Sequence, residues 1–332
     1  MRIKKCYTKN GKPYYSAPLV VNIQLSSYCP FKCSFCFMPQ IEKIDMSVSA
    51  LHSILSDLAE IGCRTILFGQ GEPMVCSNIL KAVELARSFG FSVKIATSGA
   101  GCTYNKLRRL YELGLNELCI SINCFNESIN NRTRMGFEEA INSIQLSKSI
   151  GMRTRLNYVA QNDTIDMFPE YIQYAEKYEV DGISILREKA DRTGEIGKYS
   201  RDKLKKLASY IKTCSIPIDI EECFCELNVF LSSRQKASIQ GCAAGKAMMA
   251  VGADGSFYPC SHLSSKAEKF TSVIQYWEGS EILAKLRDLY LEGEPCCNCV
   301  NVSKCTTCQA IYKDKRDSFH KSRVECPVYS SE

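Results

Sequence analysis

The sequence predicts an α/β fold, an open barrel of parallel strands each followed by a helix, with a small cysteine-rich module after it. Six short apolar, β-branched runs alternate with helical patterns from residue 19 to about residue 213. Such continuous apolar runs are typical of parallel strands covered on both faces. Because a closed barrel of eight units needs about 250 residues, six units in this length favour an open barrel. After about residue 215 the helical stretches shorten and cysteines crowd together.

The elements follow one another in a regular order. The expected strands cover residues 19–25, 64–68, 92–97, 117–122, 153–159 and 181–186. The first helix carries apolar residues at helical spacing from Leu51 to Ile61 and opens at Ser47, a plausible N-cap. The second is expected to begin at Ser77 and stop at Gly90, and the third to lie between residues 136 and 151. Six such units predict a partial (β/α)6 TIM-like barrel.

Composition limits the class of protein. The chain has 332 residues and a net charge of +6 spread along its length, which predicts neither a nucleic-acid nor a membrane partner. Its N-terminus lacks the apolar core of a signal peptide, and no stretch of about 20 apolar residues could span a membrane. We therefore expect a cytoplasmic protein, where its 20 cysteines stay reduced and hold metal rather than form disulfides. The predicted organisation is an N-terminal extension (1–17), the barrel (18–215), a linker (216–240) and the cysteine module (241–330).

The first metal-binding motif comes directly after the first strand. Cys29, Cys33 and Cys36 have C-x3-C-x2-C spacing, and three thiolates can hold three irons of a [4Fe–4S] cluster. The fourth iron is then open to a substrate. A zinc site is the alternative, but zinc usually takes four ligands, often as paired C-x2-C units.

These three cysteines, together with Phe35 directly before the third, match the cysteine motif of the radical S-adenosylmethionine (SAM) superfamily. The sequence resembles this superfamily over residues 18 to 215. The resemblance implies that the reduced cluster passes an electron to SAM, which splits into methionine and a 5′-deoxyadenosyl radical. That radical abstracts hydrogen from a substrate, and the protein supplies binding and orientation. A reductant such as flavodoxin or ferredoxin is the implied electron source.

The resemblance continues after the second strand, where Gly71, Glu72 and Pro73 match the G-G-E-P motif that binds the SAM amino group. Gln70 replaces its first glycine. Ser98 and Ser121, near the ends of the third and fourth strands, resemble further SAM-contacting positions. The SAM carboxylate would pair with Arg134 or Arg132.

The C-terminal cysteines form a second pattern, which resembles the SPASM domain of radical SAM enzymes. It contains Cys242, Gly255-x4-Cys260, Cys296-x2-Cys299-x5-Cys305-x2-Cys308 and Cys326. The resemblance implies an iron–sulfur-stapled domain with two auxiliary [4Fe–4S] clusters. The distal cluster would be bound by Cys296, Cys299, Cys305 and Cys326, and the proximal one by Cys242, Cys260 and Cys308. The last internal gap has two residues instead of three, and zinc remains the rival metal because C-x2-C pairs also suit it.

The proximal set is one ligand short. Cys223 or Cys225 could complete it, could donate a hydrogen atom to a substrate radical, or could be an ordinary buried thiol. Apart from these cysteines, the catalytic residues are not identifiable from the sequence.

Three functions are compatible with this pattern. The favoured one is oxidation or cross-linking of a peptide or protein side chain, that is, a radical SAM oxidoreductase acting as a peptide maturase. The alternative is a dehydrogenase or epimerase for a small molecule such as a sugar or aminocyclitol. An electron carrier is disfavoured, because it has no use for an open-iron loop. Since the expected barrel begins near residue 18, a separate peptide-recognition protein is a further candidate partner.

Overall fold

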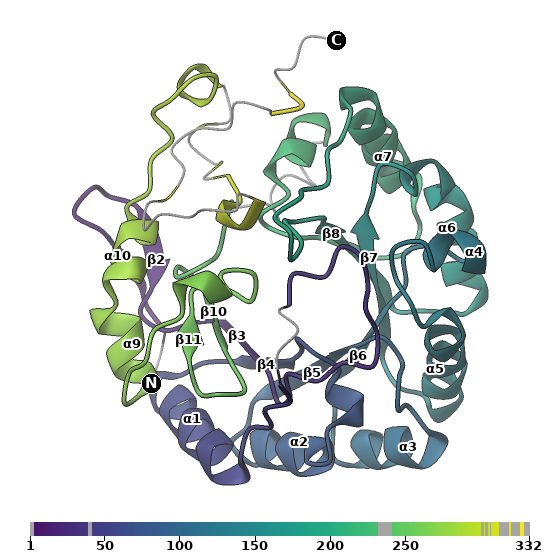
Figure 1. Cartoon of the computed structure of the whole chain (residues 1–332), viewed down its shortest axis with the longest axis horizontal. Helices are drawn as coiled ribbons and strands as arrows, with labels where there is room; N and C mark the ends of the chain where they lie inside the picture. Colours follow the sequence, from purple (N-terminus) through teal and green to yellow (C-terminus); the bar gives the residue numbers. More distant parts are fainter. Residues whose placement is uncertain are drawn as a thin grey trace.

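The computed structural model describes residues 3–38, 42–231 and 241–299, and the positions 302, 305, 307–311, 319 and 326–328. A nine-stranded sheet forms its centre, in the order β11-β10-β3-β4-β5-β6-β7-β8-β9. All neighbours are parallel except β10 and β11. The sheet curves with its helices outside, which is an incomplete TIM-like barrel (Figure 1). The predicted α/β fold class is confirmed.

The six predicted strands are present within two residues of their expected ends. They are β3 (Val20–Ile23), β4 (Thr65–Phe68), β5 (Ser92–Thr97), β6 (Glu117–Ser121), β7 (Thr154–Ala160) and β8 (Gly182–Arg187). Alternate residues of β3 to β5 are buried against the helices, and the residues between them face the inside of the barrel.

The outer helices follow the strands in turn. They are α1 (Val48–Ile61), α2 (Ile79–Ser88), α3 (Tyr104–Glu112), α4 (Glu127–Asn130), α5 (Phe137–Ile150), α6 (Phe168–Lys177) and α7 (Arg201–Thr213). Ser47 caps α1 by accepting a hydrogen bond from Ala50 N–H, as predicted. Helix α2 begins after Asn78 rather than after Ser77, and Asn78 makes no side-chain cap bond.

The sheet is longer than the sequence predicted. β9 (Ile218–Ile220) pairs with β8 inside the predicted linker, and β10 (Met248–Val251) pairs with β3 from within the cysteine module. β11 (Phe257–Tyr258) then pairs with β10. These strands are short, and β10 joins β3 across most of the chain, so their sequence signal is weak. The domain boundaries therefore stay a prediction, and the sheet takes strands from both sides of them.

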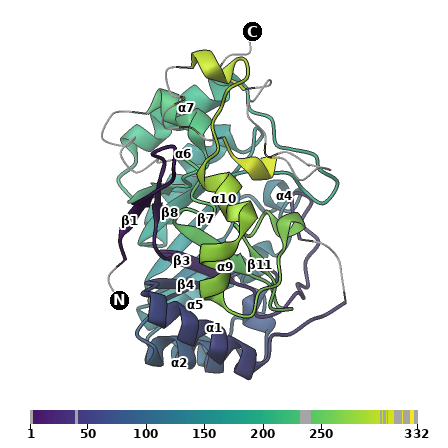
Figure 2. The same ribbon diagram turned by 90° about the vertical axis from the view of Figure 1, so that its left-hand side faces the viewer.

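The first residues and the last helices pack on the same side. β1 (Lys5–Tyr7) and β2 (Pro13–Tyr15) form a hairpin close to α9 (Val273–Gly279) and α10 (Glu281–Arg287), as Figure 2 shows. Trp277 Nε1–H donates to Tyr15 O at 3.0 Å, and the Arg287 guanidinium lies over the Tyr14 ring at 4.5 Å. These contacts attach the hairpin to the C-terminal part of the chain.

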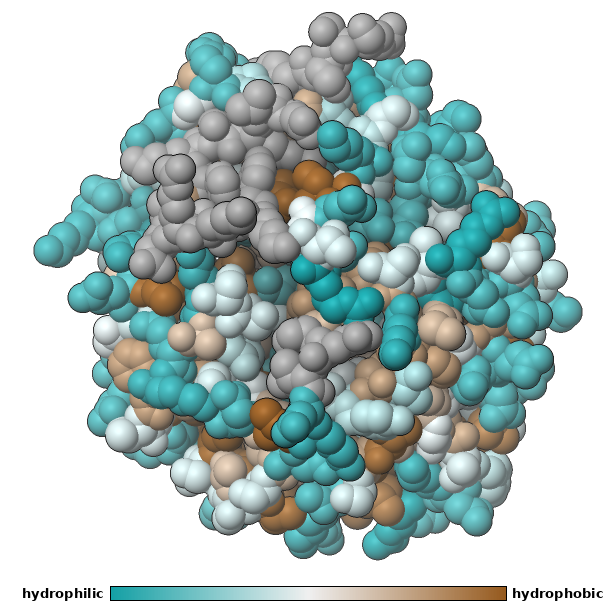
Figure 3. All heavy atoms as spheres, in the orientation of Figure 1, coloured by the Kyte–Doolittle hydropathy of each residue, from teal (hydrophilic) through white to brown (hydrophobic). Residues whose placement is uncertain are grey.

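The core of the barrel lies between the sheet and its helices and is made of buried aliphatic and aromatic side chains. Among the described residues, no helix is long and apolar enough to cross a membrane. On the face seen in Figure 3, mostly hydrophilic side chains cover the periphery, and hydrophobic ones are scattered between them.

Candidate functional site

The three-cysteine loop leaves the end of β3, and Cys29, Cys33 and Cys36 are each half-buried on it. Cys36 N–H donates to Cys33 O at 3.2 Å. Burial raises the pKa of Cys29 to about 11 and also raises that of Cys36, and negative charge on neighbouring thiols adds to both shifts. A bound cation would stabilise thiolates that repel one another in this way, so the three thiols fit the ligand set of an iron–sulfur cluster.

Three further loops hold the cysteine loop in place through its backbone. They follow β4, β6 and β8, so they lie at the same end of the barrel, as the carboxyl ends of parallel strands must. The bonds run from Glu72 N–H to Tyr28 O (2.9 Å), from Ser34 N–H to Thr133 O (2.9 Å) and from Arg192 N–H to Cys36 O (3.2 Å).

Glu72 is the centre of the turn after β4 and is 1% exposed. Its carboxylate accepts hydrogen bonds from Met74 N–H (3.0 Å), the Thr97 hydroxyl (2.7 Å), and both the backbone N–H and the hydroxyl of Ser98. Burial raises the pKa of Glu72, although these bonds act in the opposite direction. The bonds use the four acceptor positions of the carboxylate, so a further donor could bind there only in place of one of them, for example the rotatable Ser98 hydroxyl.

Gly71 lets this turn touch the cysteine loop. Its φ is +63°, and a Cβ added to it would lie 2.9 Å from Tyr28 O and closer still to Ser26 O. Any side chain would therefore separate the turn from the residues that precede Cys29.

Arg134 is the arginine that the structure brings to the cysteine loop. Its guanidinium lies over the Phe35 ring at 4.8 Å, and Nε–H donates to Asn123 Oδ1 at 3.2 Å. Burial lowers the pKa of Arg134, whereas the nearby Cys33 and Cys36 favour its charged form. A second anion such as a carboxylate would stabilise the charged form further.

Arg132 points elsewhere: it is exposed and lines a cavity of about 220 Å³ beside the loops after β7 and β8. The cavity also contacts Gln161, whose Nε2–H donates to Glu188 Oε1 at 2.8 Å. Burial raises the pKa of Glu188. Ser121 is half-buried at the end of β6.

The C-terminal cysteines fall into two groups. The first, named here the proximal cysteines, contains Cys223, Cys242, Cys260 and Cys308. The Cys223 thiol hydrogen-bonds to Cys308, and this bond, with nearby Lys189, lowers the pKa of Cys308 to about 7. Cys242 and Cys308 both act electrostatically on Cys260, which burial keeps protonated in the absence of metal. Cys223 thus contacts Cys308 of the predicted proximal set.

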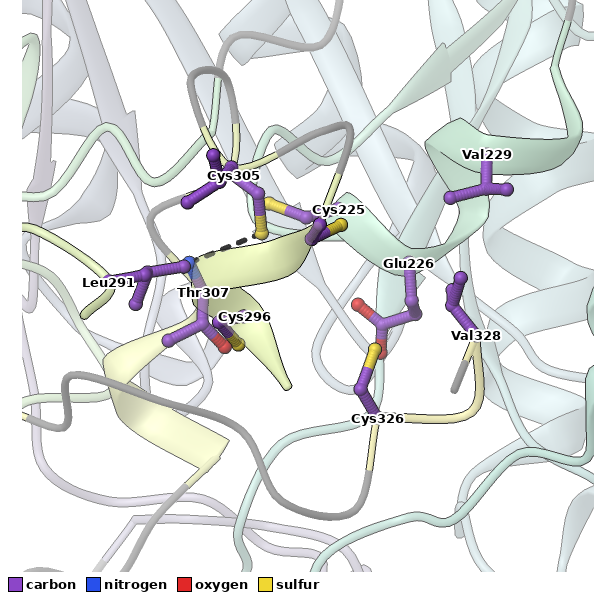
Figure 4. Close-up of a pocket in the computed structure, with 11 residues that line it drawn as sticks. Cys225, Glu226, Val229, Leu291, Cys296, Cys305, Thr307, Cys326 and Val328 are labelled. Atoms are coloured by element: carbon purple, nitrogen blue, oxygen red, sulfur yellow. Dashed lines mark hydrogen bonds between the residues drawn. The ribbon is translucent and has the colours of Figure 1, made fainter. Parts of the chain in front are cut away.

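The second group, the distal cysteines, lines one cavity and contains Cys225, Cys296, Cys299, Cys305 and Cys326. Figure 4 shows Cys225 and Cys305 with their sulfur atoms side by side, and Thr307 N–H donates to Cys305 Sγ at 3.4 Å. Four of these residues are the predicted distal set, and Cys225 is a fifth thiol. Of the two cysteines that the sequence left open, Cys223 hydrogen-bonds to Cys308, whereas Cys225 hydrogen-bonds to Cys305 and also lies within electrostatic reach of Cys242.

The sequence did not reveal two buried ion pairs between these groups and the barrel. Arg187 Nε–H donates to Glu226 Oε1 at 2.7 Å, and Lys189 Nζ–H donates to both oxygens of Glu221 at 2.6 Å. Both cations come from the end of β8, and both acids flank the segment that carries Cys223. In the sequence these pairs are marked only by charged residues at the end of a strand, and exposed surface residues give the same pattern.

His262 packs against Phe37, with ring centroids 3.8 Å apart and the rings tilted by 34°. Burial and nearby Lys189 hold the pKa of His262 well below its usual value, so its ring is neutral. The pair joins the cysteine loop to the proximal cysteines. Five cysteines outside the loop and the two groups are buried: Cys63, Cys76, Cys102, Cys119 and Cys124.

The fold and site define a partial α/β barrel with a three-thiol loop at the carboxyl end of its strands. Comparison with protein families matches residues 23–175 to the radical SAM superfamily. Residues 23–175 are therefore a radical SAM domain, and the predicted resemblance to this superfamily is confirmed for them. This family implies a [4Fe–4S] cluster with SAM.

Solved structures share the whole fold. SuiB from Streptococcus suis, bound to S-adenosylmethionine, is 18% identical with a TM-score of 0.77; the match covers 94% of this chain and 78% of SuiB. The enzyme anSMEcpe with bound AdoMet is 18% identical with a TM-score of 0.69, over 94% of this chain and 95% of that one. Methylornithine synthase (PylB) is 16% identical with a TM-score of 0.52, over 78% of this chain and 76% of PylB.

Proposed function

We propose that this chain cleaves SAM reductively at the Cys29–Cys33–Cys36 loop and uses the resulting radical to oxidise or cross-link a peptide or protein side chain. The observation that carries the proposal is the contact between the Gly71–Glu72 turn and the cysteine loop, which joins a SAM-binding motif to an open cluster site. A [4Fe–4S] cluster bound there supplies the electron that splits SAM into methionine and a 5′-deoxyadenosyl radical.

The residues around the loop then have distinct tasks. Arg134, held by Asn123 and Phe35, binds the SAM carboxylate. The turn at Gly71 and Glu72 binds the SAM amino group, and Ser98 and Ser121 contact SAM. Flavodoxin or ferredoxin is the proposed reductant.

A peptide substrate is supported by two of the similar structures. SuiB has a structure bound to precursor peptide SuiA, with a TM-score of 0.78, and anSMEcpe has one with AdoMet and Cp18Cys peptide. Because each match covers 94% of this chain, we extend the peptide class of substrate to it.

The two cysteine groups support two auxiliary [4Fe–4S] clusters and hence a SPASM domain. In the described part of the chain, no three Cys, His, Asp or Glu side chains converge closely enough to share one metal ion. A cluster binds each thiolate to a different iron, so its ligands need not converge on one point as zinc ligands do. We assign Cys223 as the fourth proximal ligand, because it hydrogen-bonds to Cys308.

The test is anaerobic reconstitution followed by metal analysis and reduction with SAM. Three clusters give about 12 irons per chain, and Cys33→Ala should give about 8 with no 5′-deoxyadenosine. The matched control is Cys6→Ala. Cys6 is a half-buried thiol on β1 that belongs neither to the cysteine loop nor to the proximal or distal cysteines, so this variant should keep the iron content and the SAM cleavage of the parent protein. Zinc in place of iron at the C-terminal cysteines would refute the SPASM assignment.

Substrate class needs a second measurement, the mass of peptides incubated with the reduced enzyme. Oxidation or an internal cross-link gives a product two hydrogens lighter, whereas epimerisation leaves the mass unchanged. Peptides encoded beside the gene are the first candidates. If sugars or aminocyclitols stimulate release of 5′-deoxyadenosine and no peptide does, the small-molecule alternative replaces the peptide proposal.

A further inference from the structure

The four proximal cysteines lie together in an apolar cluster that is separate from the core of the barrel. They pack there with buried or half-buried aliphatic side chains, among them Leu263, Leu286 and Ile311. Apolar surroundings screen charge less than water does. A buried charge beside these cysteines therefore acts strongly on a group that they bind.

Lys189 brings a positive charge to this cluster. It is buried on the loop that follows β8, and the neighbouring Ala190 N–H donates to Ala310 O, in the same cluster, at 3.3 Å. The Lys189 charge acts to lower the pKa of each of the four proximal cysteines. All four thiols therefore share this cation.

Glu221 pairs with Lys189 but does not cancel its charge at the cluster. Lys189 Nζ–H donates to both oxygens of Glu221 at 2.6 Å, and the Glu221 side chain is 27% exposed against 6% for Lys189. The Glu221 charge has the larger effect on Cys223, and the Lys189 charge has the larger effect on Cys308, Cys242 and Cys260. The cation of the pair thus dominates at three of the four thiols.

Two contacts tie the proximal cysteines to the SAM site. Arg192, on the same loop as Lys189, donates its N–H to Cys36 O at 3.2 Å. His262 packs against Phe37, directly after Cys36, and lies within reach of the Lys189 charge. A substrate radical formed at the cysteine loop would therefore arise beside the proximal cysteines.

Oxidation of a side chain needs an electron acceptor at this place. It removes two hydrogens, of which the 5′-deoxyadenosyl radical takes one as a hydrogen atom. The second leaves the substrate radical as a proton to water and an electron. A [4Fe–4S] cluster becomes more negative when it takes up an electron, so a nearby cation stabilises its reduced form and raises its reduction potential.

We infer that the Lys189 charge raises the reduction potential of the [4Fe–4S] cluster on the proximal cysteines, and so makes that oxidised cluster the acceptor of the electron lost by the substrate radical. This inference rests on the proposed function and deepens it by naming the residue that sets the direction of electron transfer. Glu221 limits the effect, because its negative charge opposes that of Lys189.

The test is anaerobic redox titration, followed by electron paramagnetic resonance, of reconstituted Cys33→Ala protein, which should retain only the auxiliary clusters. Adding Cys242→Ala should remove the midpoint potential of the proximal cluster and so identify it. Lys189→Gln keeps an N–H donor for Glu221 but removes the charge. A unit charge about 10 Å away in a protein changes an equilibrium about tenfold, so the proximal midpoint should fall by about 59 mV for one electron. The distal midpoint should not move.

Three further variants separate a charge effect from a loosened fold. Lys189→Arg keeps the charge and should keep the parent midpoint. Glu221→Gln removes the opposing anion and should raise the proximal midpoint. The matched control is Lys148→Gln, which breaks an ion pair with Asp181 (Nζ to Oδ2, 2.9 Å) at the opposite end of the barrel and should leave both midpoints unchanged.

An unchanged proximal midpoint in Lys189→Gln would overturn the inference, and so would shifts of the same sign in Lys189→Gln and Glu221→Gln. If Lys189→Gln fails to retain its clusters, Glu221→Gln decides alone: a raised midpoint supports the inference, and an unchanged or lowered one overturns it. Zinc at the proximal cysteines would overturn it together with the SPASM assignment. SAM cleavage fails on a different result, the absence of 5′-deoxyadenosine, so the two failures are distinguishable.

Discussion

A substitution at Gly71 tests most sharply whether contact between the Gly71–Glu72 turn and the cysteine loop is needed for SAM binding. In Gly71→Ala the new methyl group would lie 2.9 Å from Tyr28 O and closer to Ser26 O, well inside van der Waals contact with rigid backbone. Alanine loses about 1 kcal/mol of stability in the left-handed conformation, and the backbone shift that removes the clash costs about 2 kcal/mol more. Because the clash separates the turn from the residues before Cys29, SAM affinity should fall at least tenfold.

The matched control is Gly90→Ala, since Gly90 has a φ of +84° and no atom within 4 Å of an added Cβ. This variant should lose only about 1 kcal/mol of stability, through the backbone alone, and bind SAM normally. Chemical denaturation gives the stabilities, and equilibrium dialysis of reconstituted protein against labelled SAM gives the affinities. If Gly71→Ala binds SAM as tightly as Gly90→Ala, the turn does not position the cysteine loop for SAM binding.

Three more predictions concern other parts of the chain. Hydrogen bonds from Lys94 and Arg153 outweigh burial and lower the pKa of Glu117 from 4.5 to about 2, so its ionised form stabilises the fold. The stability that Glu117 contributes should be complete above pH 4.5 and should decline as the pH falls towards 2. Glu117→Gln should lower the free energy of unfolding by about 3 kcal/mol at pH 7, measured by urea denaturation, and should abolish this pH dependence. Cys223→Ser should alter the electron paramagnetic resonance spectrum of the reduced proximal cluster and leave the SAM-cleaving cluster unchanged; an unchanged spectrum would exclude Cys223 as a ligand. Arg134→Ala should raise the Kd for SAM about tenfold, since a charged hydrogen bond is lost, whereas Arg132→Ala should not, and the reverse order would reassign the carboxylate site.

The fold was predictable where local pattern decides it. The strands β3 to β8 are apolar, β-branched and separated by helices with ordinary start and stop residues, so periodicity located each of them. β10 was not predictable, because Met248 pairs with Val20 and nothing in either segment specifies the other. Long-range pairing of short strands depends on the whole fold rather than on local preference.

The candidate site was likewise predictable where the motif is local and not where it depends on the folded chain. Spacing identified the cysteine loop and the Gly71–Glu72 turn, since both are short contiguous motifs. Spacing could not decide between Cys223 and Cys225, because residues two apart can point to different sides of an irregular segment.

The position of β3 between β10 and β4 has a consequence for the order of events during synthesis. β3 carries the cysteine loop at its end, yet one of its two edges stays without a partner until residues 248–251 leave the ribosome. Domains fold as units during synthesis, so β3 would keep one open edge until β10 pairs with it. The strand that carries the cysteine loop is therefore the place where early and late parts of the chain join one sheet.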